Sequence, residues 1–162
     1  MGIATLSSDT TRILRHLVAT IAYRASHSLR DAPEGFETVR LAKGSKTAGE
    51  LVFHITQVLS FAMATVTGTE RVRYEPQDWT REVERFYGLL AQLDASLAAG
   101  ASMEEGMDLK LVQGPLADAL THIGQLHSMR RKAGAPIAAT SYLKAEVRAG
   151  RTALQDQVDV VG

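Results

Sequence analysis

The sequence predicts an all-α fold, a four-helix bundle with a long connection between helices one and two and a short C-terminal helix. Four long segments carry apolar residues three and four positions apart, which is the repeat of an amphipathic helix. No segment shows the sustained alternation that is typical of a β-strand. With 162 residues, 45% of them hydrophobic and 22% charged, the chain is long enough to bury one core. We therefore expect a single domain over residues 1–162.

The first predicted helix runs from Ser8 to Leu29, and Pro33 and Gly35 follow its end. Its apolar stripe consists of Leu14, Leu17, Val18, Ile21, Ala25 and Leu29. A helix turns by about 100° per residue, so a second set of side chains falls on the opposite side. We expect this strip to face solvent or another subunit, and its members are Arg12, His16, Tyr23 and His27.

The second predicted helix begins at Thr47, after a connection that is longer than a tight turn. Thr47 to Glu50 has the pattern of a capping box, in which the threonine and the glutamate each accept a hydrogen bond from a backbone amide of the first turn. Gly68 is placed to end the helix. The apolar face consists of Leu51, Val52, Ile55, Val58, Leu59, Ala62 and Val66.

The third and fourth predicted helices also begin and end at recognisable residues. The third starts near Asp78, a good N-cap residue, and ends before Gly100. Its apolar residues are Trp79, Val83, Phe86, Leu90, Leu93 and Leu97. The fourth starts at Gly114-Pro115, because proline suits a first helical turn, and ends at Gly134. Its inward residues are expected to be Val112, Leu116, Ala119, Leu120, Ile123 and Leu126.

The C-terminal part of the sequence predicts one further, short helix. Ser141 is placed to cap it, Ala149 to be its last residue and Gly150 to stop it. The remaining residues, about 151–162, carry no helical repeat, and we expect them to form a loose tail.

The charge balance and the residue usage exclude several classes of protein. Lysine plus arginine equals aspartate plus glutamate at 18 each. We therefore expect no nucleic-acid partner, because proteins that bind nucleic acids carry an excess of basic residues. No apolar run approaches the ~20 residues that cross a bilayer, and the first residues lack the pattern of a signal peptide. We therefore expect a cytoplasmic protein without a membrane partner. The chain has no cysteine, which leaves nitrogen and oxygen as its metal ligands.

The five histidines are the candidate nitrogen ligands. His127 lies on the inward face of the fourth helix, where a hydrogen-bonded core histidine is the simpler interpretation. His54 lies at the margin of the second helix's apolar face, from which it can reach a cleft between helices. Asp118 precedes His122 by one turn, so both side chains leave the same side of the helix and can bind one cation.

Other interpretations of the Asp118 and His122 spacing remain open. An ordinary surface pair of this kind is common and stabilises a helix by only a few tenths of a kcal/mol. Both residues also lie off the centre of the apolar face, which would suit a site in a groove or at one end of the bundle. Gln125 and Tyr142 could supply polar contacts to metal ligands or to a substrate nearby.

Three segments carry a resemblance to a known family. They are TAGELVFHITQVLSFAM, LVQGPLADALTHIGQLHSMRRKAGAPI and SYLKAEVRAGR, which together extend from about Thr47 to Arg151. In these segments the sequence resembles the DNA-damage-inducible B (DinB-like) family of metal-binding four-helix bundles. The resemblance implies one divalent ion (Zn, Ni, Mn or Fe) held by His54, Asp118 and His122. Many members have histidine where Asp118 stands, and a harder oxygen donor changes the metal preference.

The resemblance leaves two classes of function. One is a metal-dependent transferase or isomerase that uses a low-molecular-weight thiol, or a metal-dependent hydrolase, with a small thiol or electrophile as substrate. The other is a non-enzymatic interaction or stress-response protein with a structural or vestigial metal site. In that case the strip on the first helix would be a homodimer or partner surface, and a homodimer is our expectation. A di-iron oxygenase and a serine hydrolase are disfavoured, because neither Glu-x-x-His nor Gly-x-Ser-x-Gly occurs.

Overall fold

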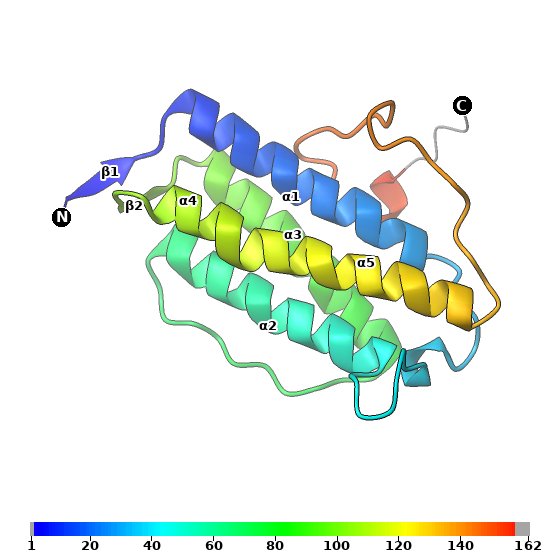
Figure 1. Ribbon diagram of the computed structural model, residues 1–162. Helices are drawn as coiled ribbons and strands as arrows, with labels where there is room; N and C mark the ends of the chain where they lie inside the picture. Colours follow the sequence, from blue (N-terminus) through cyan, green and yellow to red (C-terminus); the bar gives the residue numbers. More distant parts are fainter. Residues whose placement is uncertain (1, 158–162) are drawn as a thin grey trace.

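A computed structural model describes residues 2–157 of the chain, and this part is mostly helical (Figure 1). The long helices are α1 (Ser8–Leu29), α2 (Ala48–Thr67), α3 (Trp79–Ala98) and α5 (Ala117–Lys132). Short helical segments are η1 (Phe36–Thr38), α4 (Met107–Leu111), η2 (Val112–Leu116) and η3 (Leu154–Asp156). In Figure 1 the long helices lie side by side along a common direction. α1 and α2 each pack against both α3 and α5, so the predicted all-α character is confirmed.

Side-chain caps fix where α1, α2 and α3 begin, and at the start of α1 Ser7 accepts from the amide of Thr10. The capping box at the start of α2 is complete, because Thr47 accepts from the amide of Glu50 and Glu50 accepts from that of Thr47. Asp78 accepts from the amide of Arg81 at the start of α3. Gly68 ends α2 in the left-handed conformation, at φ 66°, which glycine adopts without steric cost. The predicted boundaries of the first three helices are thus confirmed.

The core lies between the four long helices and contains most of the predicted apolar residues. Leu17, Val58 and Trp79 are half-buried at its edge. Val112 is exposed, although we expected it to face inward. The largest fully buried side chains include Leu14, Ile21, Ile55, Leu59, Phe86, Leu90, Leu116, Ile123 and Leu126.

The helical structure that leads into the last long helix begins earlier than predicted. The chain is already helical from Met107, and Pro115 lies inside a π-helical segment, η2, instead of opening the helix. Proline lacks an amide hydrogen and its ring crowds the carbonyl group four residues earlier, so an ordinary α-helical turn would be strained there. A wider π turn accommodates it, and such turns occur often at functional sites. The helical direction therefore continues from α4 through η2 into α5.

A two-stranded antiparallel ribbon joins the N-terminus to the connection between α3 and α4. β1 (Ile3–Thr5) pairs with β2 (Ser102–Glu104), with Ile3 opposite Glu104. The amide of Leu6 continues the pairing by donating to the carbonyl group of Ala101. The sequence did not predict this ribbon, because strands of three residues are too short to show alternation.

The predicted short C-terminal helix is wrong. Residues 141–149 form turns, in which the amides of Lys144 and Ala145 both donate to the carbonyl group of Ser141. The prediction of a loose tail is also wrong for residues 151–157. Arg30 donates to the carbonyl groups of Leu154 and Gln157, and the Gln157 side chain is buried. Residues 158–162 of the predicted tail lie outside the described part of the chain.

α2 is more apolar over its whole length than the sequence pattern indicated. Within residues 2–157, α2 is the one helix that is long and apolar enough to cross a membrane, judged by length and composition only. Core helices of soluble proteins pass the same test. Here the buried side chains of α2 belong to the hydrophobic core shared with α3 and α5, which is the arrangement of a core helix.

Candidate metal centre

His54 from α2 meets Asp118 and His122 from α5. His54 lies seven positions after the capping residue Thr47. Asp118 is the second residue of α5, directly after the π-helical turn, and His122 follows one turn later. Nε2 of His54 is 3.6 Å from Oδ2 of Asp118, and Nε2 of His122 is 3.3 Å from Oδ1. Both distances exceed the ~2.7–2.9 Å of a charge-assisted hydrogen bond.

The mutual distances suit a shared ion. One nitrogen or oxygen atom from each of the three residues lies within 4.8 Å of the other two. Two ligands ~2.1 Å from one ion lie ~3.0–3.4 Å apart at neighbouring tetrahedral or octahedral positions, so small side-chain rotations would complete the geometry. The imidazole rings of His54 and His122 are perpendicular, with centroids 4.7 Å apart. In residues 2–157 this is the one such group of histidine and carboxylate side chains.

The centre is partly exposed to solvent. The side chains of His54 and Asp118 are 37% and 44% exposed, whereas that of His122 is 18% exposed. Burial is the main cause that lowers the pKa of His54, and the neighbouring His122 lowers it further, while Asp118 opposes the shift. The lowered pKa of His54 favours its neutral form, in which a nitrogen lone pair is free for a cation.

Gln125 orients one of the candidate ligands. Its Oε1 lies 2.8 Å from Nδ1 of His122. When Oε1 accepts the hydrogen bond from Nδ1, the lone pair of the imidazole is on Nε2, the atom that faces Asp118. The structure thus brings the predicted contact residue Gln125 to the centre.

Tyr142, the other predicted contact residue, lies in a second cluster. Its ring is 6.1 Å from that of His27 and 6.4 Å from that of Tyr23, and the Arg24 guanidinium stacks over it at 4.0 Å. His127 belongs to the same cluster, because its Nε2 is 3.0 Å from the carbonyl oxygen of Arg24. The predicted hydrogen bond of a core histidine is thus confirmed for His127. The structure does not show Tyr142 in contact with the metal candidates.

This cluster interrupts the strip that we predicted on the first helix. Arg12 and His16 are exposed, but Tyr23 is only 5% exposed and His27 is half-buried. The C-terminal segment, through Tyr142, covers this part of α1. The prediction that the four residues form one outward surface is therefore wrong, and a homodimer would need a different contact face. Residues 136–157 carry no helical repeat, so the spacing of apolar residues could not predict that this segment covers part of α1.

The comparisons with known proteins add no relative: no family model, no curated protein and no solved structure matches the chain.

Proposed function

We propose that the chain is a DinB-like four-helix bundle that binds one divalent metal ion through His54, Asp118 and His122. The convergence of these three side chains from α2 and α5 carries the proposal. The packing of α1 and α2 against both α3 and α5 is the arrangement that such a bundle needs. The sequence segments that resemble the family contain the same three residues.

Two imidazole nitrogens and one carboxylate oxygen suit Zn, Ni, Mn or Fe as the ion. Three protein ligands leave further positions on the ion for water or a substrate. A bound divalent cation would lower the pKa of a thiol or a water molecule held there. We propose a low-molecular-weight thiol or a small electrophile as the substrate, in a transfer, isomerisation or hydrolysis reaction.

Each residue of the centre would have its own role in binding the ion. His54 and His122 supply neutral nitrogen donors, and Asp118 supplies the negative charge that offsets part of the cation's charge. Gln125 holds the His122 ring in the tautomer that binds through Nε2. The exposed side of His54 and Asp118 gives a small molecule access to the ion.

Metal analysis of protein purified without an affinity tag tests the binding site. We expect about one divalent ion per chain in the parent protein. His122→Ala should lose most of it, since removal of a direct ligand costs at least 10–100-fold in affinity. His16→Ala is the matched control, because His16 is exposed on α1 and outside the centre. Equal metal content in all three proteins would contradict the proposal.

An assay with several thiols and electrophiles, with and without metal, tests the enzymatic part. We expect turnover that depends on metal, survives His16→Ala and is lost in His122→Ala. Metal binding without turnover across the panel would instead favour the non-enzymatic alternative, in which the ion has a structural role.

A further inference from the structure

A cavity of about 670 Å³ lies between the C-terminal ends of α1 and α5 and the segment that follows α5. α1 contributes Ser26 and His27 to its wall, and α5 contributes Arg130. Much of the remaining wall belongs to residues 136–141. None of the wall residues belongs to the candidate metal centre, and Arg130 lies more than two helical turns after His122 on α5.

The wall of this cavity carries an excess of positive charge. Arg30, Arg130 and Lys144 are basic, and Asp31 is the one carboxylate of the wall. Arg30 contributes to the fold, because it donates to two carbonyl groups of the C-terminal segment. Lys144 is exposed and pairs with no carboxylate within residues 2–157. The wall therefore attracts anions and repels cations.

Arg130 is the wall residue that points to a ligand. It is only 8% exposed, and it pairs with no carboxylate within residues 2–157. Its Nε donates to the carbonyl group of Ala135, and its Nη1 donates to those of Ser28 and Arg30. Nη2 takes part in none of these bonds and keeps some accessible surface. Two N–H groups of a buried cation in the cavity wall thus have no acceptor among the described residues.

The fold balances the charge of Arg130 only in part. The carbonyl groups at the ends of α1 and α5 carry partial negative charge, which offsets some of the positive charge of the guanidinium. Burial lowers the pKa of Arg130, and the nearby Asp31 opposes this shift without forming an ion pair. Buried charged groups are usually paired, because burial without a counterion is costly. An anion in the cavity would supply the missing charge and accept from Nη2.

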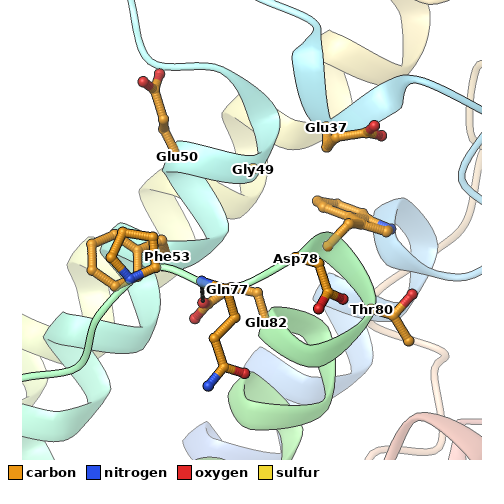
Figure 2. A pocket seen from close by; sticks show the side chains of 10 residues that line it. Glu37, Gly49, Glu50, Phe53, Gln77, Asp78, Thr80 and Glu82 are labelled. Carbon is orange, nitrogen blue, oxygen red and sulfur yellow. Dashed lines mark hydrogen bonds between the residues drawn. The ribbon is translucent and has the colours of Figure 1, made fainter.

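Another cavity shows how the chain balances charges within itself. This cavity, of about 550 Å³, lies beside the starts of α2 and α3, with Glu50, Asp78 and Glu82 in its wall (Figure 2). Each of these carboxylates forms an ion pair with an arginine of the chain, at N–O distances of 3.3 to 3.6 Å. Those three charges are therefore balanced without a ligand, whereas the charge of Arg130 is not.

The rest of the wall around Arg130 indicates the class of anion. The amides of residues 137–140 donate to no acceptor within residues 2–157, so they add hydrogen-bond donors. Pro136, Ile137 and Ala145 add apolar surface. The volume of about 670 Å³ is that of a small-molecule site. We infer that this cavity binds a small organic carboxylate, which accepts hydrogen bonds from Nη2 of Arg130 and places its apolar body against Ile137.

Titrations with four probes test the class of ligand. They are hexanoate, the neutral hexanamide, the cation hexylammonium and inorganic phosphate, each added to the full chain and followed by amide chemical shifts. The neutral chelator phenanthroline is present, so that a carboxylate cannot bind through a metal ion. We expect saturable binding of hexanoate, with shifts at Ile137 and Thr140. Hexanamide should bind about tenfold more weakly or worse, because a charge-assisted hydrogen bond is lost, and hexylammonium should not bind.

Three results of these titrations would overturn the inference. The first is a lack of saturation by hexanoate. The second is equal affinity for hexanoate and for either hexanamide or hexylammonium, since charge would then not decide binding. The third is binding of phosphate as tight as that of hexanoate, which would show that the cavity takes a bare anion and does not use its apolar wall.

Variants locate the recognition in the cavity. Arg130→Gln should weaken hexanoate binding by about tenfold or more, because the charge and the Nη2 donors are lost. Lys144→Glu should weaken it by about threefold or more, because it reverses one charge of the wall. Lys110→Glu, at an exposed position on α4 outside the cavity, is the matched control and should not change it.

The test also stands if one variant does not fold. Should Arg130→Gln fail to fold because the ends of α1 and α5 lose their link, Lys144→Glu decides alone. Undiminished hexanoate binding in every folded wall variant would refute the site. The metal content of each variant, purified without chelator, should stay at the parent level, which separates this site from the proposed metal centre.

Discussion

His122 has the most constrained side chain of the candidate metal centre. One ring nitrogen is 2.8 Å from Gln125, and the other is 3.3 Å from Asp118. Its partners lie three residues after it and four residues before it on α5, so the helical repeat alone positions all three groups. The centre therefore depends on packing for one residue only, His54, which α2 must bring to α5.

His127 gives a prediction for single-residue titration. Burial is the main cause that lowers its pKa, and His27, Arg131 and Arg24 lower it further, against the effect of the hydrogen bond to the Arg24 carbonyl group. Its stabilising contribution is therefore present above the unfolded pKa of about 6.5 and is lost as pH falls through the folded pKa. We expect the parent protein to lose unfolding free energy between about pH 7.5 and pH 5.5.

His127→Gln keeps an amide donor but removes the titration, so it should lose less stability over the same interval. Urea unfolding at both pH values measures this difference. His16→Gln, at an exposed position on α1, should retain the pH dependence of the parent protein. The prediction fails if His127→Gln and the parent show the same dependence.

The sequence predicted some of these side-chain positions and missed others for identifiable reasons. The common direction of Asp118 and His122 follows from their spacing on one helix, and Gln125 extends the same strip. The approach of His54 to this pair was predicted from the family resemblance, because the spacing within one helix carries no information about residues on another helix. Tyr142 was misplaced because the path of the C-terminal segment depends on tertiary contacts, such as those of its ring with α1.

Among the secondary-structure elements, those with side-chain caps were predicted best. The complete capping box of α2 and the Asp78 cap of α3 use local hydrogen bonds, which the sequence shows directly. The start of the last helix was misjudged, because Pro115 is favourable at a first turn and is also tolerated in a π turn. The short C-terminal helix failed for a related reason: Ser141 begins a turn, but no apolar face holds the next turns in a helix.

Thr47→Ala tests the contribution of the capping box to α2. The substitution removes the acceptor for the Glu50 amide and should lower the free energy of unfolding by about 1 kcal/mol. Chemical denaturation measures the change. Thr80→Ala, at an exposed threonine in the first turn of α3, is the matched control and should change stability by less than half as much. Equal effects of the two substitutions would show that the cap contributes little.

At the scale of the whole molecule, buried and partly buried hydrogen bonds join elements that are distant in sequence. Arg15 on α1 donates two hydrogen bonds of 2.9 Å to the carboxylate of Asp94 on α3. Arg130 near the end of α5 donates to the carbonyl groups of Ser28 and Arg30, which ties it to the end of α1. By contrast, α2 and α5 meet beside the candidate metal centre, where His54 and Asp118 approach at 3.6 Å without a hydrogen bond.

A metal ion at this centre should therefore stabilise the whole fold by linking α2 to α5. A ligand that binds only the folded state, at about one hundred times its dissociation constant, adds about 2.7 kcal/mol to the free energy of unfolding. For a chain of this size that corresponds to a rise in Tm of roughly 5–10 °C. We expect this rise when Zn²⁺ or Ni²⁺ is added to metal-free parent protein or to His16→Ala, measured by thermal unfolding. His122→Ala and Asp118→Ala should show little rise, because each retains only two of the three ligands. A rise of equal size in all four proteins would mean that the ion binds elsewhere on the chain.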